Sequence, residues 1–392
     1  MKPSNPLHPN TPTEANPSRF DPVKLQTMLH EDHIAWSFRH MDHILPKRDI
    51  LAPSDPADKF RFSERTQPLD DISYEFNGQS ATIGQYMDKV RATGLLVIKD
   101  DTIVFERYYQ GYTRESIATS MSVAKSIVSL LLGIAFDEGA LQDVHDPVTR
   151  YLPELAGSGY DGASVKDVLQ MSSGVRFNED YHDPNADIHA FLQDVFGETP
   201  MPITQFIGKL PRLQPPGHYQ YKSADTQVLS MLLERTTGKK TAAYLEEKLW
   251  LPLGMEYDAY WNTDLHGNEI TFAFVNAALR DYAKIGRLVL HQGAWNGRQV
   301  VSERWIRESI IPDRDELRAV NDDGYFGYQY QWWTPGGSGE SEMMARGIYG
   351  QQIYINREHQ AIIVKTGVDP NIYNVYDNEA IPAYRTLLAH LS

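Results

Sequence analysis

A serine and a lysine stand three residues apart at the head of an otherwise apolar segment, SMSVAKSIVSLLLGIAFDEG, residues 120–139. On a helix, residues with this spacing share one face with their Cβ atoms about 5–6 Å apart, so Ser122 and Lys125 can touch. The first helical turn carries free backbone N–H groups and the positive end of the helix dipole, which favour developing negative charge. Burial of Lys125 would lower its pKa and let the neutral amine take the proton of the Ser122 hydroxyl. The pair therefore predicts a nucleophilic serine with a lysine base.

The same two residues also have a plainer explanation. A serine at a helix start is a common N-cap, and a lysine can extend its ammonium to solvent along an apolar surface. Ser-x-x-Lys alone does not decide between these interpretations, so further motifs must. One of them is YQYKSAD, which follows a Pro-Gly turn and contains Tyr221, Lys222 and Ser223. A phenol near two cations can have a lowered pKa and carry a proton, although Tyr221 is one of 22 tyrosines and an ordinary buried tyrosine is the alternative.

Composition limits the remaining function classes. The chain has 392 residues, of which 41% are hydrophobic and 23% are charged, as in soluble globular proteins. A net charge of −15 would repel a phosphate backbone, which argues against nucleic acid as a partner. There is no cysteine, so disulfides, thiolate zinc ligands and cysteine nucleophiles are excluded. With no signal-peptide core and no run of about 18 apolar residues, we expect a cytoplasmic protein with no membrane partner.

The first 112 residues are expected to contain an arm, a helix and a hairpin. Residues 1–20 are rich in Pro, Asn, Ser and Thr, which predicts a flexible arm. Asp21 can cap a helix whose first position suits Pro22. Two β-rich runs within residues 93–112 are separated by Lys-Asp-Asp at 99–101, which predicts a hairpin.

The rest of the chain changes from helical to strand patterns. Helical periodicity prevails over about 122–290, with Pro and Gly in the connections. Aromatic residues at 328, 330 and 332 alternate with glutamines at 329 and 331, which predicts a strand with one aromatic face. A second hairpin is expected over Gln351–Gly367, and a helix over 376–392. Strands, then helices, then strands predict a sheet with an inserted helical lobe and a ligand cleft between them.

Together these motifs resemble the penicillin-recognising serine hydrolase superfamily, which includes serine β-lactamases, D-alanyl-D-alanine peptidases and related esterases. The resemblance rests on SMSVAKS, SVKDVLQMSSGV, YQYKSA and RGIYGQQIYI in this order. Longer stretches, among them AWSFRHMDHILP, NEDYHDP and RDYAKIGRLVLHQGAWNGRQVVSERWI, resemble the 6-aminohexanoate-dimer hydrolase branch, which degrades nylon oligomers. The implied fold is α+β and β-lactamase-like: an antiparallel sheet flanked by helices, with an inserted all-α lobe.

The implied domain is a single catalytic one over 21–392. Its α/β lobe would span about 21–121 and 300–392, and its all-α lobe about 122–299, with the active site in the cleft between the lobes. The resemblance implies no cofactor and no metal, and it allows a homodimer.

The resemblance also implies roles for single residues. Ser122 would be the nucleophile, Lys125 its activating partner and Tyr221 a second acid/base that protonates the leaving group. Tyr181 matches a tyrosine that contacts the substrate amide in the resembling branch, with a surface loop tyrosine as the alternative. Ser223 stands where many relatives have asparagine and would support the site by hydrogen bonding.

The third motif departs from the pattern of β-lactamases and peptidases, which carry Lys-Thr-Gly on a strand of the site. Here we place it at 348–351, with Tyr349, Gly350 and Gln351 binding substrate. A strand N–H near Tyr349–Gln351 would complete an oxyanion hole with that of Ser122. The literal Lys-Thr-Gly at 365–367 leaves only 25 residues after it, so we interpret Lys365 as a strand-end charge. This departure argues against β-lactamase activity. The absence of Ser-Asp-Asn argues against the branch that uses a separate glutamate for deacylation.

The sequence therefore predicts a serine hydrolase that cleaves small carboxylic esters or linear amides through an acyl-enzyme. Two alternatives stay open: a D-amino-acid peptidase or weak β-lactamase, and a catalytically silent penicillin-binding-like sensor. Two His-x2-His pairs also suggest a metal site, although their spacing is not that of a helical zinc motif. We expect these residues, His30, His33, His40 and His43, to be partly exposed helix histidines. His182, Asp183 and Asp187 are expected at a pocket rim.

Overall fold

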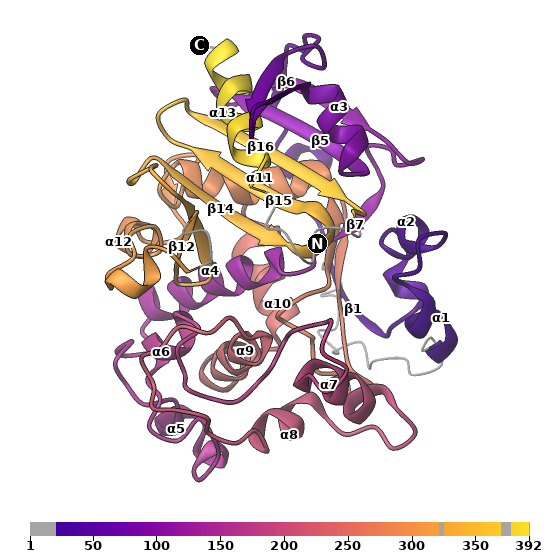
Figure 1. Cartoon of the computed structure of the whole chain (residues 1–392). Coiled ribbons are helices and arrows are strands. Elements are labelled where there is room, and N and C mark those ends of the chain that lie inside the picture. Colours follow the sequence, from indigo (N-terminus) through magenta and orange to yellow (C-terminus); the bar gives the residue numbers. More distant parts are fainter. Residues whose placement is uncertain (1–20, 321–324, 370–377, 392) are drawn as a thin grey trace, which may run out of the picture.

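An eight-stranded sheet dominates the computed structural model, which describes residues 21–320, 325–369 and 378–391 (Figure 1). Its strand order is β12-β13-β14-β15-β16-β5-β6-β2, and neighbouring strands are antiparallel except for the parallel pair β2 and β6. The strands span Ser63–Glu64 (β2), Ala92–Lys99 (β5), Thr102–Tyr108 (β6), Phe326–Gln329 (β12), Trp332–Pro335 (β13), Glu342–Gly347 (β14), Gln351–Asn356 (β15) and Ala361–Gly367 (β16).

A second, four-stranded antiparallel sheet leads the chain to Ser122. Its order is β1-β8-β9-β7, with strands Lys47–Ile50 (β1), Ala259–Asn262 (β8), Val275–Ala278 (β9) and Ile117–Thr119 (β7). Two small antiparallel pairs lie outside both sheets: Ser73–Phe76 (β3) with Gln79–Thr82 (β4), and Ala294–Trp295 (β10) with Arg298–Gln299 (β11).

Helices cover both faces of the large sheet. Helix α11 (Leu279–Leu290) packs on one face, and α3 (Ile83–Lys89) and α13 (Ala380–His390) lie on the other (Figure 1). Strand β5 is buried on both faces because its alternate side chains enter two different apolar cores. The close approach of α11 requires Gly286, since a Cβ there would lie 2.7 Å from the Ile362 side chain.

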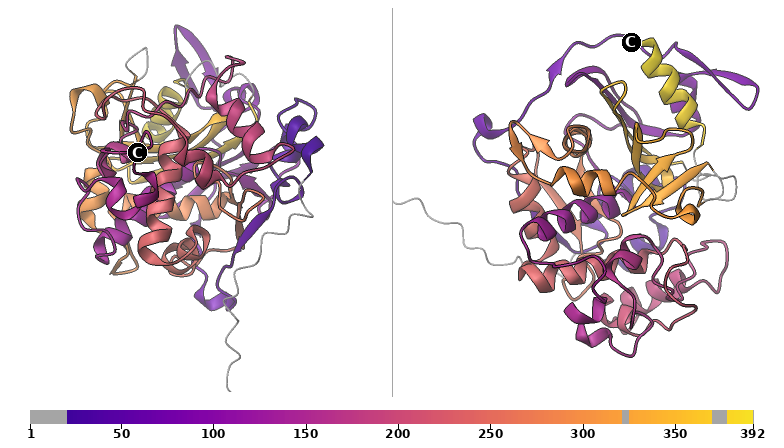
Figure 2. Two further views of the ribbon diagram at one scale, coloured as in Figure 1. Left: turned by 90° about the horizontal axis from the view of Figure 1, so that it is seen from below. Right: turned by 90° about the vertical axis from the view of Figure 1, so that its left-hand side faces the viewer.

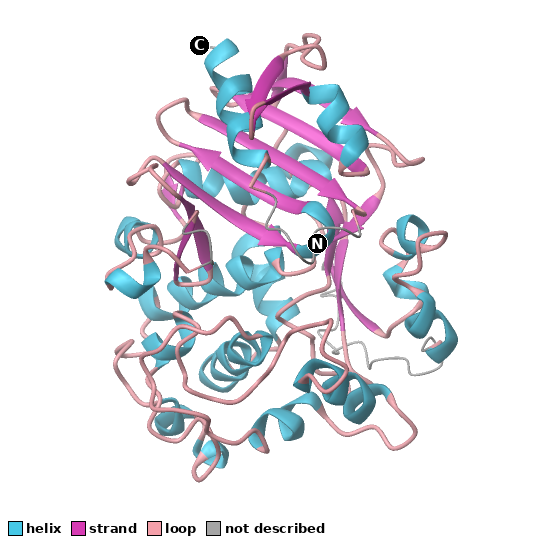
Figure 3. Cartoon of the chain, viewed as in Figure 1, coloured by secondary structure: helices cyan, strands magenta, loops and turns pink. Residues whose placement is uncertain are grey.

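The remaining helices form the lobe between the strand segments or flank the sheets. Helices α4 and α9 pack together at its centre, and α4 also contacts β14 and β15. The helices from α5 to α9 gather at the end of the molecule opposite α13 and are joined by long loops (Figures 2 and 3). Their bounds are Pro22–Thr27 (α1), Ile34–Ser37 (α2), Val123–Asp137 (α4), Val148–Tyr151 (α5), Val165–Leu169 (α6), Asp187–Phe196 (α7), Ile203–Gly208 (α8), Ser223–Thr237 (α9), Thr241–Leu245 (α10) and Glu303–Glu308 (α12).

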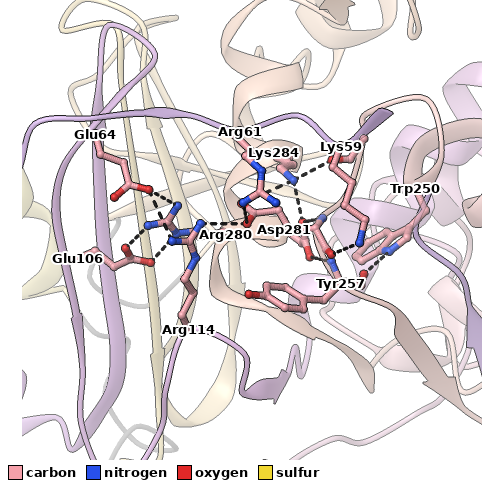
Figure 4. A network of polar contacts seen from close by, with 12 residues as sticks. Lys59, Arg61, Glu64, Glu106, Arg114, Trp250, Tyr257, Arg280, Asp281 and Lys284 are labelled. Carbon is pink, nitrogen blue, oxygen red and sulfur yellow. Dashed lines mark hydrogen bonds and ion pairs between the residues drawn. The ribbon is translucent and has the colours of Figure 1, made fainter. Parts of the chain in front are cut away.

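The first turn of α11 joins the two sheets through buried polar contacts (Figure 4). Arg280, only 1% exposed, donates from Nε to Glu106 at 2.7 Å and from Nη1 to Glu64 at 2.7 Å. These carboxylates belong to β6 and β2 of the large sheet. The next residue, Asp281, accepts the backbone N–H of Tyr257 at 3.0 Å, just before β8 of the second sheet. Helix α11 is therefore attached to both sheets at its start.

Most of the expected elements are present. The α+β class, both hairpins and the C-terminal helix are confirmed. The first helix is confirmed with its cap, because the Asp21 carboxylate accepts the backbone N–H of Lys24 at 3.0 Å. The expected flexible arm, 1–20, lies outside the described residues.

Two expectations were wrong. Residues 328–332 are not one strand, because the chain turns at Tyr330 and Gln331, whose φ values of 41° and 68° are left-handed. The segment 122–299 is not all helical either: β8 and β9 lie within it, and α11 covers the large sheet. The cause is that apolar four-residue strands have no periodicity that separates them from buried helix. No helix in the described ranges has the length and apolar character needed to cross a membrane.

Candidate active site

Ser122 lies where the chain turns from β7 into α4. Met121 just before it has a φ of 43°, a left-handed conformation that residues other than glycine rarely adopt. Ser120 holds this turn on β9, since its N–H donates to the Val275 carbonyl at 2.7 Å and its hydroxyl accepts the Val275 N–H at 3.0 Å. Ser122 occupies the N-cap position, but its side chain does not cap the helix backbone. Its hydroxyl therefore remains available to Lys125.

Lys125 is buried beside this hydroxyl, with 1% of its surface exposed. Its Nζ donates to Ser122 Oγ at 2.8 Å and to the carbonyl oxygen of Phe272 at 3.0 Å. It does not extend to solvent, as the plainer interpretation requires. Burial lowers the pKa of Lys125 to about 8, against a smaller raising effect of the Glu179 carboxylate. A neutral amine is thus accessible near neutral pH.

The Tyr221 ring lies beside the Lys125 ammonium. The Lys125 Nζ lies 5.0 Å from the centroid of the Tyr221 ring. Two rings of the β12–β13 hairpin support the tyrosine, Tyr328 at 6.1 Å and Trp333 at 5.6 Å between centroids. The structure therefore brings Ser122, Lys125 and Tyr221 together, from two segments about a hundred residues apart in the sequence.

Glu179 is a site residue that the sequence analysis missed. Its carboxylate accepts both the N–H and the hydroxyl of Ser223, each at 2.6 Å, and the Tyr181 hydroxyl at 3.4 Å. It also acts electrostatically on Lys125. Ser223 thus helps to hold the Glu179 carboxylate near Lys125. The available signal was an acidic residue two positions before Tyr181, in a segment already noted for that tyrosine.

The other polar residues of this loop brace the loop itself. Asp183 accepts the side-chain amide of Asn178 at 3.0 Å, and Asp187 accepts its backbone N–H at 2.7 Å. Neither carboxylate nor His182 lines the cavity beside Ser122. The expected rim position of these three residues is therefore wrong: the two carboxylates hold the loop through Asn178 instead.

Strand β14 ends against the Ser122 turn. A Cβ at Gly347 would lie 2.9 Å from the Ser122 backbone nitrogen, so glycine permits this approach. The next residues, Ile348 and Tyr349, line the cavity. Tyr349 and Gly350 have left-handed φ values of 64° and 95° and turn the chain into β15.

Gln351, by contrast, points away from the cavity. Its side chain donates to the carbonyl of Gly367 at 2.7 Å and accepts the Gly367 N–H at 3.2 Å, which clamps β15 to β16. Gly350 and Gln351 are not among the cavity-lining residues. The strand segment at the site thus begins with Gly347, earlier in the chain than the expected 348–351.

Lys365 lies outside the site. It is fully buried and donates to the Tyr86 hydroxyl at 3.0 Å, on the sheet face that α3 covers. The expectation of a strand-end charge is therefore wrong, although the inference that this Lys-Thr-Gly is not the third motif agrees with its position. No lysine or arginine from the described residues lines the cavity beside Ser122.

The cavity that opens beside Ser122 has a volume of about 380 Å³. Ser122, Tyr181, Ser223 and Tyr349 line one end of it, which is the candidate catalytic end. Its remaining walls are mainly apolar and come from α1, α7 and the loop before β9. They include Leu25, Met28, Ile188, Phe191, Phe196 and Phe274.

No metal centre is apparent in the part of the chain that the structure describes, since no group of three or more His, Asp or Glu could hold an ion there. The histidines of the two His-x2-His pairs lie around α2. The His40 ring stacks on Trp36 at 4.7 Å, and its Nδ1 is hydrogen bonded to the Trp36 carbonyl at 2.9 Å. These contacts agree with the expectation that the histidines are not metal ligands.

Known proteins are similar to this chain in sequence. Residues 80–378 match the family model described as Beta-lactamase. A 6-aminohexanoate-dimer hydrolase of Paenarthrobacter ureafaciens is 30% identical over 355 residues, which cover 86% of this chain and 86% of that protein.

Solved structures extend the similarity to the fold. A Bacillus anthracis protein provisionally named as a 6-aminohexanoate-dimer hydrolase has a TM-score of 0.83 at 23% identity, covering 99% of both chains. A penicillin-binding protein homologue of Pyrococcus abyssi has a TM-score of 0.60 at 17% identity, covering 79% of this chain and 76% of that one.

Proposed function

The chain belongs to the beta-lactamase family of hydrolases, and from this premise we propose that it cleaves small carboxylic esters or linear amides through an acyl-enzyme on Ser122. The observation that carries the proposal is the hydrogen bond of 2.8 Å from Lys125 Nζ to Ser122 Oγ in a buried site. Family membership agrees with the resemblance inferred from the motifs.

In the first step, neutral Lys125 accepts the proton of the Ser122 hydroxyl while Oγ attacks the substrate carbonyl. The oxyanion that forms is stabilised by the backbone N–H groups of Ser122 and Ile348, at the positive end of α4 and beside the end of β14. The carbonyl then re-forms, the bond to the leaving group breaks, and Tyr221 supplies a proton to the departing oxygen or nitrogen. Water then adds to the acyl-enzyme while the Tyr221 phenolate takes its proton. The bond to Ser122 Oγ breaks, the protonated Lys125 returns a proton to this oxygen, and the acid is released.

Glu179 supports this cycle without contacting the reacting atoms. Because its carboxylate raises the pKa of Lys125 against the lowering effect of burial, it keeps the lysine able to carry a proton after attack. Its two short hydrogen bonds from Ser223 fix the carboxylate in place. Glu179 is thus a positioning residue rather than a catalytic one.

The peptidase and β-lactamase alternatives lack support at the third motif. In those relatives a lysine on this strand attracts a substrate carboxylate, whereas here Arg346 and Gly347 stand before Ile348, and Lys365 is buried against Tyr86. The arrangement of Ser122, Lys125 and Tyr221 also speaks against a silent sensor. Multiple turnover of any ester would eliminate the sensor, and inertness toward a chromogenic cephalosporin would argue against the β-lactamase.

Turnover of p-nitrophenyl butyrate and of a linear amide by the wild type and by Ser122→Ala tests the proposal. We expect Ser122→Ala to lose at least about 10³-fold in kcat, as for removal of a covalent nucleophile. Ser129→Ala is the matched control, because Ser129 is buried on the same helix with a hydroxyl that has no hydrogen-bond partner among the described residues. Equal activity of Ser122→Ala and the control would refute the assignment.

A further inference from the structure

Among the residues that the structure describes, none places a fixed charge in the cavity beside Ser122 away from its catalytic end. Among the described residues that line it there is no Asp, Glu, Lys or Arg, and His189 is the one titratable group other than tyrosine. Glu179 and Lys125 lie at the catalytic end, where they are engaged by Ser223 and Ser122. A charged substrate group that entered the apolar walls would lose its hydration without gaining an opposite charge.

The exposed residues that line the cavity are uncharged as well: Pro22, Gln26, Leu29, Leu192 and Gln193. Leu29 and Leu192 both line the cavity, and they are 40% and 42% exposed. They approach it from different segments, Leu29 following α1 and Leu192 within α7. Exposed leucines at the opening of an apolar cavity indicate a site for an apolar ligand.

The position of Tyr221 indicates which part of the substrate the cavity receives. In the proposed mechanism Tyr221 protonates the leaving group, so that group must depart toward its hydroxyl. Tyr221 is packed by Tyr328 and Trp333 and does not line the cavity. The cavity therefore remains for the acyl side of the scissile bond.

We propose that the acyl group accepted by this site is an uncharged aliphatic chain of several carbons, and that an acyl chain ending in an ammonium or a carboxylate is rejected. This inference rests on the proposed function. It separates the chain from the substrate in the name of its Paenarthrobacter relative, since each half of a 6-aminohexanoate dimer carries a charged end. The volume of about 380 Å³ is in the range of cavities that enclose small organic ligands.

The test compares p-nitrophenyl esters of heptanoic, 6-aminohexanoic and adipic acid, which share a leaving group and a similar length. We expect kcat/KM for the heptanoyl ester to exceed that for each charged ester by at least about tenfold at pH 8. Equal or faster cleavage of either charged ester would overturn the inference. Preference for the adipoyl ester would show that the cavity recognises a carboxylate, and this result too would overturn it.

A charge introduced without a change in shape provides a second test. Gln193 lines the cavity, is exposed on α7, and can be replaced by glutamate with the same size. We expect Gln193→Glu to raise kcat/KM for the 6-aminohexanoyl ester relative to the heptanoyl ester by several-fold; Gln193→Met is the uncharged control. An unchanged ratio would mean that charge does not govern selection.

Failure of the proposed function looks different from failure of this inference. If no ester is turned over, or if Ser122→Ala retains turnover, the acyl-enzyme proposal fails. If turnover depends on Ser122 but the charged esters react as well as the heptanoyl ester, only the inference about the acyl group fails.

Discussion

Two opposing effects, burial and the nearby Glu179 carboxylate, set the protonation state of Lys125. Burial destabilises the ammonium and lowers the pKa to about 8, while the Glu179 carboxylate stabilises it. A lysine with an unperturbed pKa near 10.4 would rarely be neutral at neutral pH, and one without a nearby anion would be a weaker base. The balance between desolvation and Glu179 therefore determines the pH range in which Ser122 is activated.

The first prediction concerns the pH profile of kcat/KM. Activity should rise with pH through about 8 as Lys125 loses its proton, since kcat/KM reports the free enzyme. Glu179→Gln removes the charge that raises the pKa of Lys125, so its rise should move to lower pH. Glu75→Gln, an exposed site on β3, is the control and should leave the profile in place. If kcat/KM of Glu179→Gln rises at the same pH as the wild type, or at a higher pH, this result would contradict the role given to Glu179.

Two turns of the large sheet differ in how well the sequence predicts them. The β5–β6 turn contains Asp100 and Asp101, with left-handed φ values of 49° and 58°, and Asp adopts this conformation more readily than most residues. The hairpin was therefore predictable from local residue types. The turn at Tyr330 and Gln331 carries no such residue and was mistaken for the middle of a strand.

Long-range contacts account for that second turn. The Gln331 side-chain amide donates to the Leu169 carbonyl at 2.9 Å, and its oxygen accepts the Thr226 hydroxyl at 2.7 Å. These partners belong to α6 and α9, which are distant in the sequence. The local residue pattern around Gln331 therefore does not predict the turn. The hydrogen bonds of Glu179 with Ser223 were hidden from the sequence analysis for the same reason.

The second prediction concerns the β5–β6 turn. Asp101 accepts hydrogen bonds from Arg287 at 2.9 and 2.7 Å, and these bonds with those to His291 outweigh burial and lower the pKa of Asp101 to about 2. Because its folded pKa lies below the unfolded value, the stabilisation is present above about pH 4 and is lost as pH falls toward 2. Asp101→Asn should lower the free energy of unfolding at pH 7 by about 1 kcal/mol, after allowance for partial exposure.

Urea denaturation checks this effect, with Asp100→Asn as the control. Asp100 occupies the same turn with a similar φ, but its carboxylate is 67% exposed and pairs with the neighbouring Lys99. Equal unfolding midpoints for both variants would show that the contact with α11 does not stabilise the hairpin.

At the scale of the molecule, the site depends on segments that the chain brings back to one place. The first turn of α4 and its N-cap supply Lys125 and Ser122, and the segment just before α9 supplies Tyr221. Glu179 comes from a loop of the helical lobe and Gly347 from the end of β14. The sequence analysis predicted the order of strands, helices and strands from changes in periodicity. It could not predict that β8, β9 and α11 return to the sheets, because their attachment depends on contacts such as Arg280 with Glu106 and Glu64.

The third prediction tests that attachment. Arg280→Met would leave the Glu106 carboxylate, 12% exposed, without its buried counter-charge. Loss of one partner of a buried ion pair typically costs about 3–5 kcal/mol, so we expect a fall of at least about 3 kcal/mol in the free energy of unfolding by urea. Arg298→Met, at an exposed position on β11, is the control.

The double variant Arg280→Met with Glu106→Gln should recover part of this loss, because it removes the unpaired carboxylate. A single variant as stable as the wild type would show that the polar contacts at the start of α11 do not hold the two sheets together.

Intact-mass spectrometry after treatment with a fluorophosphonate probe tests the central claim, that Ser122 is the nucleophile, most directly. The wild type and Ser129→Ala should each gain one adduct, and Ser122→Ala, otherwise folded to the same extent by circular dichroism, should gain none. An adduct that persists in Ser122→Ala, or the absence of any adduct on a wild type that turns over p-nitrophenyl butyrate, would contradict the assignment and return Lys125 to a structural role.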